Sequence, residues 1–142
     1  MYAEKGLVDL QTVSIPRSHE NCMVCGSSNS LGLCFQACQG GVETFFQASS
    51  SWQGYQGVLH GGMICTLLDA AMTHCLFEQG VEAMTADLQV RFLKPTPCSG
   101  LLQLRASLQQ QRRHLYQLSA ELLCEGEVLA RSEARFLQRK PI

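Results

Sequence analysis

Residues 61–79 constrain the fold more than any other stretch of this chain. The run Gly-Gly-Met-Ile-Cys-Thr-Leu-Leu-Asp-Ala-Ala-Met-Thr-His-Cys-Leu-Phe-Glu-Gln contains no proline, and Gly80 follows it. Its pattern is helical, but its apolar residues cover nearly the whole circumference of the helix. A helix of this kind has to be enclosed by other structure. We therefore expect the rest of the chain to wrap around it.

One carboxylate, that of Asp69, lies in the middle of this apolar run. At about 100° per residue it falls on one narrow stripe with Gly62, Thr66 and Thr73. The two threonine hydroxyls are expected to bond carbonyl oxygens of their own helix. Asp69 has no such partner in the pattern, and an unpaired buried carboxylate is costly enough that it protonates or finds partners. Chemistry explains its presence better than stability does, so Asp69 is the leading catalytic candidate.

The segments around this helix alternate with a period of two, which is typical of half-buried strands. Two of them flank the Gly40-Gly41 turn and predict a hairpin before the helix. Those after the helix predict a meander of consecutive strands with one apolar face. The alternating patterns cover residues 31–37, 42–48, 88–92, 102–108, 116–122 and 128–136. Together they predict an α+β fold, one antiparallel β-sheet wrapped around one long central α-helix.

The length of 142 residues fits one domain with a single core. Residues 1–20 show no clean period and predict an irregular N-terminal segment, which leaves residues 21–142 for the domain. The open edges of a single sheet are commonly protected by pairing with a second copy. We therefore expect self-association.

The charge balance excludes some classes of partner. The chain carries 11 basic and 12 acidic side chains, which gives no support for a nucleic-acid partner or for electrostatic attachment to a membrane. No apolar run approaches the length needed to span a bilayer, and the N-terminus lacks the pattern of a signal peptide. We expect a cytoplasmic protein with no nucleic-acid or membrane partner.

The predicted helix begins with His60-Gly61-Gly62, where unpaired backbone N–H groups carry partial positive charge. Such groups can hold a developing oxyanion, and glycine lets a carbonyl group approach the backbone closely. Asp69 lies roughly 12 Å farther along the helix axis than Gly61. One carbonyl group cannot contact both. A site that uses both therefore needs the N–H group of one subunit and the carboxylate of another.

A thioester suits such a site, because its carbonyl is activated and its thiolate leaves without strong acid assistance. A carboxylate beside that carbonyl can act as a general base on water or as a nucleophile, and the sequence does not separate the two. The chain has no Gly-x-Ser-x-Gly motif and no glycine-rich phosphate loop with lysine. Two common classes of hydrolase are thereby excluded.

Two motifs carry a resemblance to a known family. They are Gly57-x-x-His60-Gly61-Gly62 followed by Asp69, and Met84-Thr85-Ala86-Asp87-Leu88-Gln89-Val90-Arg91-Phe92-Leu93-Lys94-Pro95. Over residues 20–140 the chain resembles the hotdog-fold thioesterase superfamily, of the phenylacetate-degradation (PaaI-like) and mammalian THEM type. This resemblance implies hydrolysis of acyl-CoA by dimers or tetramers. It also implies that Asp69 is the base or nucleophile, Gly61 the oxyanion donor, His60 a residue that shapes the entrance, and Thr85 an aid to the attacking water.

Other residues are candidates for substrate binding. Some relatives carry an asparagine six residues before the histidine, where this chain has Gly54, and Gln53 or Gln56 is a possible substitute. The substrate-binding candidates are Gly62, Gly54, Gln56, Arg91 and Lys94. The acyl group, and the choice between coenzyme A and a carrier protein, stay open.

Thr85 poses a difficulty, because it shares strand parity with Asp87 and Gln89. A regular strand turns all three side chains away from the helix. Either the strand bulges at this point or Thr85 reaches the site of the partner subunit.

Two other functions fit the same fold. The domain could bind acyl-CoA as a sensor without turnover, although the carboxylate of Asp69 is then hard to explain. It could also be a hotdog dehydratase of hydroxyacyl thioesters, a chemistry that pairs a histidine with a carboxylate, here His60 and Asp69. The paired glycines and the spacing from Asp69 to Thr85 look more like those of thioesterases.

The cysteines are expected to be reduced thiols, because several lie in the apolar helix and in strand patterns. They are Cys22, Cys25, Cys34, Cys38, Cys65, Cys75, Cys98 and Cys124. His19, Cys22 and Cys25 have the spacing His-x2-Cys-x2-Cys, which zinc sites also use. In one strand, however, Cys34 and Cys38 would lie about 13 Å apart and could not both join a site. The sequence favours a packed turn here, with no metal and no cofactor.

Overall fold

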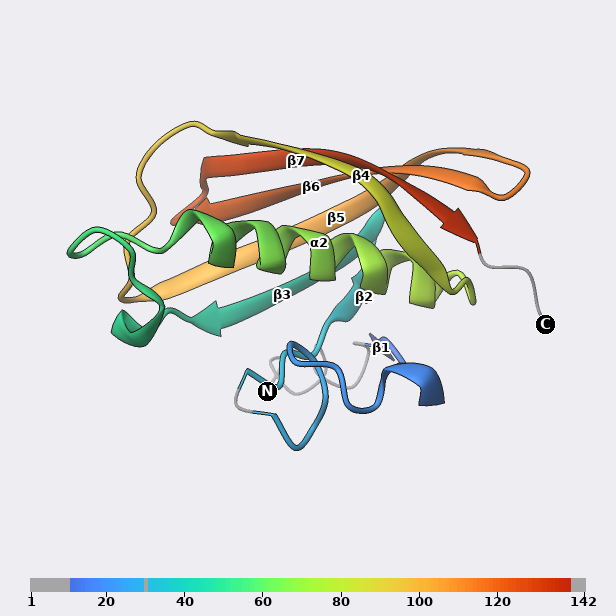
Figure 1. Cartoon of the computed structure of the whole chain (residues 1–142), viewed down its shortest axis with the longest axis horizontal. Coiled ribbons are helices and arrows are strands. Elements are labelled where there is room, and N and C mark those ends of the chain that lie inside the picture. Colours follow the sequence, from blue (N-terminus) through green and yellow to red (C-terminus); the bar gives the residue numbers. More distant parts are fainter. Residues whose placement is uncertain (1–10, 30, 139–142) are drawn as a thin grey trace, which may run out of the picture.

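The computed structural model describes residues 11–29 and 31–138 of the chain. The first half of the predicted N-terminal segment, residues 1–10, lies outside the described residues. A single long helix, α2 (Gly61–Glu78), runs through the middle of the molecule (Figure 1). Its bounds confirm the helix expected over 61–79.

The C-terminal end of α2 is capped by backbone hydrogen bonds. The N–H groups of Gly80 and Val81 donate to the carbonyls of Phe77 and Leu76, both at 2.9 Å. Gly80 has a φ of 75°, the left-handed conformation that favours glycine at the end of a helix. None of the helices formed by the described residues is both long enough and apolar enough to cross a membrane.

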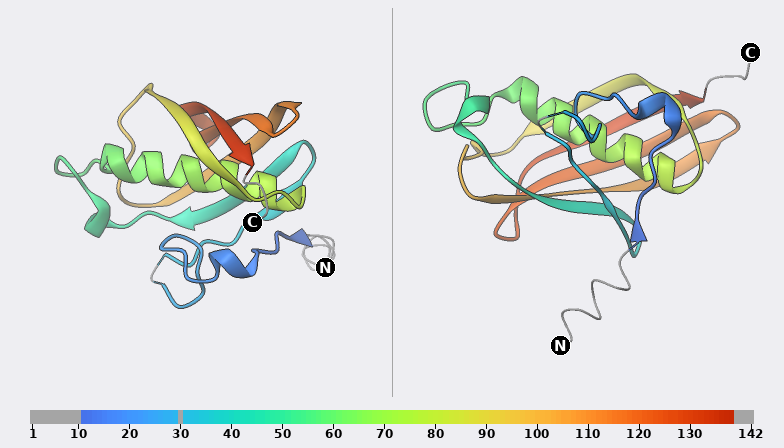
Figure 2. Two further views of the ribbon diagram at one scale, coloured as in Figure 1. Left: turned by 45° about the vertical axis from the view of Figure 1, so that its right-hand side comes forward. Right: turned by 90° about the horizontal axis from the view of Figure 1, so that it is seen from below.

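Within the described residues, seven antiparallel strands form one sheet in the order β1-β2-β3-β5-β6-β7-β4. Two short 3-10 turns, η1 (Arg17–His19) and η2 (Ser50–Trp52), lie in the connections. The strands are β1 (Gln11–Thr12), β2 (Gln36–Cys38), β3 (Gly41–Gln47), β4 (Ala83–Phe92), β5 (Leu101–Arg112), β6 (Leu115–Cys124) and β7 (Glu127–Gln138). The expected α+β architecture, a sheet wrapped around one helix, is confirmed (Figures 1 and 2).

The strand order differs in part from a simple meander. Strands β5, β6 and β7 do follow one another as hairpins, but β4 does not pair with β5. Instead β4 lies beside β7 at one edge of the sheet, and β3 pairs with β5. The chain between β4 and β5 therefore crosses from one edge of the sheet toward its middle. This order leaves the long strand β4 as an edge strand.

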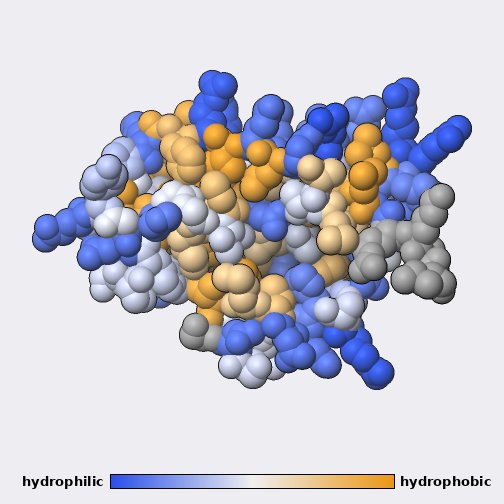
Figure 3. All heavy atoms as spheres, in the orientation of Figure 1, coloured by the Kyte–Doolittle hydropathy of each residue, from blue (hydrophilic) through white to orange (hydrophobic). Residues whose placement is uncertain are grey.

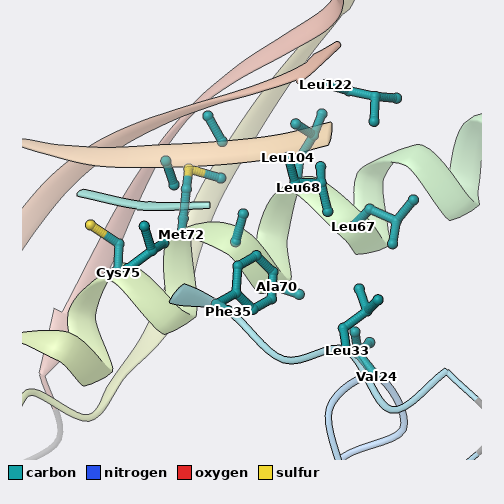
Figure 4. Packing of buried hydrophobic residues seen from close by; sticks show 14 of the residues in the cluster. Val24, Leu33, Phe35, Leu67, Leu68, Ala70, Met72, Cys75, Leu104 and Leu122 are labelled. Carbon is teal, nitrogen blue, oxygen red and sulfur yellow. The ribbon is translucent and has the colours of Figure 1, made fainter. Parts of the chain in front are cut away.

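Alternate residues of the central strands form the core against α2. Leu104 on β5 and Leu118 and Leu122 on β6 have no exposed surface. They face Leu67 and Leu68 of the helix, which are also fully buried, within one cluster (Figure 4). At about 1.5–3 kcal/mol for each fully buried leucine, these contacts are a main source of stability for the fold.

A segment before β3 covers the other side of the helix. Val24, Leu33 and Phe35 are buried and point toward Leu67 and Ala70 (Figure 4). The strand predicted over 31–37 is mostly wrong, because pairing begins only at Gln36. The apolar residues of this segment do alternate with polar or small ones, but they alternate because they pack against the helix and not because the segment pairs in the sheet. Residues 11–20 contain β1 and η1 and are otherwise irregular.

One face of the molecule is left open along β4 and the adjacent side of α2. Met84, Phe92 and Leu93 are exposed by 60%, 52% and 42%. In the space-filling view, apolar side chains gather on the face where β4 passes over α2 (Figure 3). A ten-residue edge strand with exposed apolar side chains has the features of a strand that pairs with another chain.

Candidate active site

The carboxylate of Asp69 is held by one side chain from the neighbouring strand. The Thr85 hydroxyl on β4 donates a hydrogen bond to Asp69 Oδ1 at 2.6 Å. Asp69 is only half-buried, because the open face of α2 leaves it within reach of solvent. Its second carboxylate oxygen forms no hydrogen bond with any residue that the structure describes, and so stays available for another donor.

A bulge in β4 turns Thr85 toward the helix. Thr85 pairs with Phe136 and Asp87 pairs with Arg135, so that Ala86 is the extra residue in the ladder. One extra residue reverses the side to which the preceding side chains point. The first of the two alternatives from the sequence is thereby confirmed: the strand bulges, and Thr85 reaches Asp69 of its own chain.

The two threonines of the helical stripe behave as expected. Thr66 donates to the Gly62 carbonyl at 3.0 Å and Thr73 donates to the Asp69 carbonyl at 2.9 Å. Both hydroxyls are thus occupied within the helix. Asp69 remains the one group of this stripe with an uncommitted oxygen among the described residues.

The entrance of α2 is capped by His60. Its Nδ1 accepts a hydrogen bond from the Gly62 N–H group at 2.8 Å, so the neutral ring carries its proton on Nε2. No hydrogen bond joins the N–H group of Gly61 to any residue in the described part of the chain. Of the two glycine amides, therefore, only that of Gly61 is free to bind an anion at the positive end of the helix.

The loop before the helix fits closely around His60. A Cβ at Gly54 would lie 3.3 Å from the His60 Cα, so a larger residue there would press on the cap. Gln53 Oε1 accepts from the Gly57 N–H group at 3.0 Å. Gln53 thus closes its own loop. Gln56 is exposed and does not line the entrance.

An open cavity of about 740 Å³ lies at this entrance. The Phe92 ring forms one wall and is 3.6 Å from where a Cβ at Gly61 would be. Lys94 lies at the rim and pairs with Glu127. The lining residues are Gly54, Tyr55, Val58, Leu59, His60, Gly61, Ile64, Phe92, Leu93, Lys94, Pro95 and Thr96. The cavity is mainly apolar and can accept an extended apolar group.

Thr96 is a lining residue that the sequence did not single out. It is 1% exposed, and its hydroxyl has no hydrogen-bond partner among the described residues. The sequence around it, Pro95-Thr96-Pro97, indicated only a break between strands. Its contact with the cavity depends on tertiary structure, because the Leu59 N–H group bonds the Thr96 carbonyl at 2.8 Å.

Arg91 lies away from this cavity. It pairs in register with Arg131 on β7, and both side chains are exposed on the face of the sheet that points away from the helix. They line a separate hollow of about 540 Å³ together with Glu133. Two like charges opposite one another are unfavourable unless an anion or an acidic group lies nearby.

Two other ionisable groups, Cys65 and Asp87, are poorer candidates for a general base than Asp69. Burial, and then the Asp69 charge, raise the pKa of the Cys65 thiol one turn before Asp69, so Cys65 stays protonated. The Arg135 guanidinium bonds Asp87 and lowers the pKa of that carboxyl group. Asp87 is therefore paired with Arg135 on the face of the sheet that points away from α2, whereas Asp69 lies on α2 itself.

Comparison with known proteins identifies the family. A family model described as the thioesterase superfamily matches residues 56–131, just over half of the chain. The chain belongs to the thioesterase superfamily. The matched range includes the helix entrance, Asp69, Thr85 and most of the residues that line the cavity.

Relatives of this thioesterase-superfamily chain include acyl-coenzyme A thioesterase THEM4 of mouse and of cattle. The mouse protein is 29% identical over 100 residues, which are 69% of this chain and 43% of the relative. The bovine protein is 32% identical over 89 residues, which are 63% of this chain and 36% of the relative. The chain thus spans less than half the length of these curated relatives.

Solved structures of several other proteins have the same fold. A thioesterase superfamily protein matches with a TM-score of 0.75 at 26% identity, over 80% of this chain and 58% of that one. A Bacillus halodurans protein crystallised with CoA matches with a TM-score of 0.68 at 24% identity, over 76% and 74%. A Streptococcus mutans protein bound to acetyl CoA matches with a TM-score of 0.66 at 20% identity, over 71% and 85%. The hotdog fold expected from the sequence is confirmed.

Proposed function

We propose that this chain is an acyl-CoA thioesterase whose active sites form between two copies of the chain. The observation that carries the proposal is the Thr85–Asp69 hydrogen bond, together with a free Gly61 N–H group on the same helix. The two groups lie roughly 12 Å apart along the helix axis. Two antiparallel helices related by a two-fold axis bring the Asp69 of one copy beside the Gly61 of the other.

Asp69 acts as the general base on a water molecule. The Thr85 hydroxyl donates a hydrogen bond to Oδ1, which leaves Oδ2 to accept a proton from water, while the Thr85 oxygen can accept a hydrogen bond from the same water. The water oxygen attacks the thioester carbonyl carbon as Asp69 takes up the proton. The tetrahedral intermediate then collapses, the C–S bond breaks, and the leaving thiolate takes the proton that Asp69 received, which restores the base. The products are a carboxylic acid and the free thiol.

The Gly61 N–H group of the partner copy holds the oxyanion. It lies at the positive end of a helix, and the neighbouring Gly62 N–H group is already occupied by His60 Nδ1. His60 is therefore a positioning residue that fixes the helix entrance. Gly54 supports it by letting the loop pass close to the ring.

The proposed substrate class is supported by the relatives. The curated relatives are named acyl-coenzyme A thioesterases, and two fold neighbours hold CoA or acetyl CoA. The mainly apolar cavity beside Gly61 suits the thioester end of such a substrate, with Lys94 at its rim. Arg91 lies away from this cavity, in a hollow that it shares with Arg131 and the acidic Glu133, so its contact with a substrate phosphate stays a prediction.

A further likeness supports the roles of Asp69 and Thr85. A hypothetical thioesterase protein of Streptococcus pneumoniae has been crystallised as two variants, one with an aspartate and one with a threonine replaced by alanine. The two replaced residues are 16 positions apart in that chain, the same spacing as between Asp69 and Thr85.

The edge strand β4 supplies the proposed interface. Among the described residues it pairs with β7 alone, and its exposed apolar side chains lie beside Asp69 and the cavity. Pairing β4 with the β4 of a second copy would extend the sheet and cover this face. The eight free thiols suit a reducing compartment, and we place the protein in the cytoplasm.

The dehydratase alternative is disfavoured by the state of His60. Its Nδ1 already accepts the Gly62 N–H hydrogen bond, so the ring has no free basic nitrogen at the helix entrance without breaking the cap. A sensor that binds without turnover leaves the Asp69–Thr85 pair unexplained.

Release of free thiol from a panel of acyl-CoA and acyl-carrier-protein substrates tests the proposal. We expect turnover by the wild type and a loss of about 10²–10⁴-fold in kcat for Asp69→Asn, because a general base contributes that much. Asp87→Asn is the matched control, since this carboxylate lies on the same strand as Thr85 but on the outer face, and should leave kcat nearly unchanged. Equal rates for wild type and Asp69→Asn, or tight acyl-CoA binding without turnover, would contradict the proposal.

A further inference from the structure

Three potential metal ligands converge in the segment that covers α2. A ring nitrogen of His19 and the Sγ atoms of Cys22 and Cys25 all lie within 4.8 Å of one another. A tetrahedral zinc ion holds nitrogen and sulfur ligands about 3.5–4 Å apart, so small side-chain adjustments bring this trio to coordinating distances. The cluster is remote from the cavity and is not used by the proposed reaction.

The backbone around these cysteines already has the shape of a metal-binding turn. The Val24 N–H group donates to Cys22 Sγ at 3.3 Å, a bond that stabilises a thiolate at this position. The Gly26 N–H group donates to the Cys22 carbonyl at 2.9 Å. A Cβ at Gly26 would lie 2.7 Å from the carbonyl oxygens of Cys22 and Glu20, so the close turn requires glycine. These contacts hold both sulfur atoms on the same side of the turn without help from a disulfide.

The helix supplies a fourth candidate ligand. His74 of α2 is 1% exposed, and its Nε2 has no hydrogen-bond partner among the described residues. Its Nδ1 lies 2.8 Å from the Ala70 carbonyl, which fixes the proton on Nδ1 and leaves the lone pair on Nε2. A metal-ligating histidine commonly has this arrangement, with one nitrogen bonded to a carbonyl and the other on the metal.

The two histidine rings are close to the separation that one metal requires. The ring centroids of His19 and His74 lie 6.1 Å apart in an edge-on arrangement. Two imidazoles on one tetrahedral zinc ion have centroids about 5 Å apart, so the two rings have to approach by about 1 Å for His74 to join the trio, which without His74 forms the group of ligand atoms within 4.8 Å of one another. Phe77 packs edge-on against both rings and would exclude water from the site.

We propose that His19, Cys22, Cys25 and His74 bind one structural zinc ion. Two thiolates and two imidazoles with no open position make a closed site, which is typical of structural rather than catalytic zinc. The ion would tie the segment over 19–25 to the middle of α2, where Val24 and Phe35 pack on the helix. It would thus stabilise the side of the helix opposite the sheet, and replaces the packed turn that the sequence alone favoured.

Metal content of the full chain tests the site. The protein is produced without a polyhistidine tag, dialysed, and measured by inductively coupled plasma mass spectrometry. We expect about one zinc per chain in the wild type and almost none in Cys22→Ser or Cys25→Ser. Cys38→Ser is the matched control, since Cys38 is exposed on β2 and should leave zinc in place. His74→Phe should lower zinc affinity by about tenfold or more, and unchanged affinity would remove His74 from the ligand set.

A second measurement does not depend on the variants folding. Zinc is removed from the wild type with a chelator under reducing conditions, and cobalt(II) is added. Visible ligand-field bands of tetrahedral cobalt, a thiolate charge-transfer band and a higher melting temperature support the site. Isolated protein that has reduced thiols but holds no zinc and takes up neither metal would overturn it. A Cys22–Cys25 disulfide in freshly isolated protein, detected as a mass loss of two hydrogens, would overturn it as well.

Discussion

At the scale of single residues, Gly61 and His60 decide what the helix entrance can bind. The His60 ring occupies the Gly62 N–H group and so leaves the Gly61 N–H group as the free donor among the described residues. The family resemblance already implied Gly61 as the oxyanion donor, with Gly62 only a substrate-binding candidate. The structure adds a physical reason for this choice, a hydrogen bond of the His60 side chain that no periodic pattern in the sequence indicates.

Gly61→Pro removes this donor while keeping the helix. Proline is well tolerated at the first position of a helix, and His60 already has the extended backbone, φ −60° and ψ 134°, that a residue before proline prefers. We expect an unchanged circular dichroism spectrum and a loss of about 10²–10³-fold in kcat/KM. Gly61→Ala keeps the N–H group, and its Cβ would be in ordinary contact with Phe92, so it should retain most of the activity. Equal activity of Gly61→Pro and Gly61→Ala would show that this amide is not the oxyanion donor.

At the scale of elements, the sequence predicted the helix well and the strands less well. The bounds of α2, its polar stripe and its closure at Gly80 all follow from local rules that act within one turn. The bulge at Ala86 does not follow from local rules, because it is set by pairing with β7 and by the Asp69 side chain. The alternation over 31–37 predicts a strand, although residues 31–35 alternate because they pack on a helix and pairing begins only at Gln36. An alternation of apolar and polar residues shows that one side of a segment is buried. It does not show that the segment pairs with another strand.

The buried His74 makes the stability of α2 depend on pH. Burial lowers the pKa of His74 from 6.5 to about 4, helped by the nearby His19, while the Ala70 carbonyl opposes the shift. His74 therefore binds a proton less readily in the folded protein than in the unfolded chain. The free energy of unfolding accordingly falls as the pH drops from 6.5 through 4. The loss from this group is about 3 kcal/mol once the pH is below both values.

Denaturant unfolding between pH 7 and pH 4, in a buffer with chelator so that metal does not contribute, measures this effect. In His74→Phe, which suits the aromatic surroundings of Phe35 and Phe77, most of this pH dependence should disappear. A wild type and a variant that lose stability equally over the range would show that His74 is not the group responsible.

At the scale of the whole molecule, the strand order has the largest consequence for function. The sequence predicted a sheet around a helix and open edges, but not that β4 would be the long edge. Strand order depends on contacts between segments far apart in the chain, which local patterns do not record. With β4 at the edge, the exposed apolar face, the Asp69–Thr85 pair and the cavity at Gly61 all lie on the side where a second copy would dock.

Complementation between two inactive variants tests the shared active site most directly. Asp69→Asn and Gly61→Pro are produced separately and together in equal amounts, and thiol release is measured. If each site combines Asp69 of one chain with Gly61 of its partner, a quarter of the sites in a random mixture contain both wild-type groups, and about one quarter of wild-type activity returns. If each site lay within one chain, no site would be intact. Co-produced protein no more active than either variant alone would contradict the shared site.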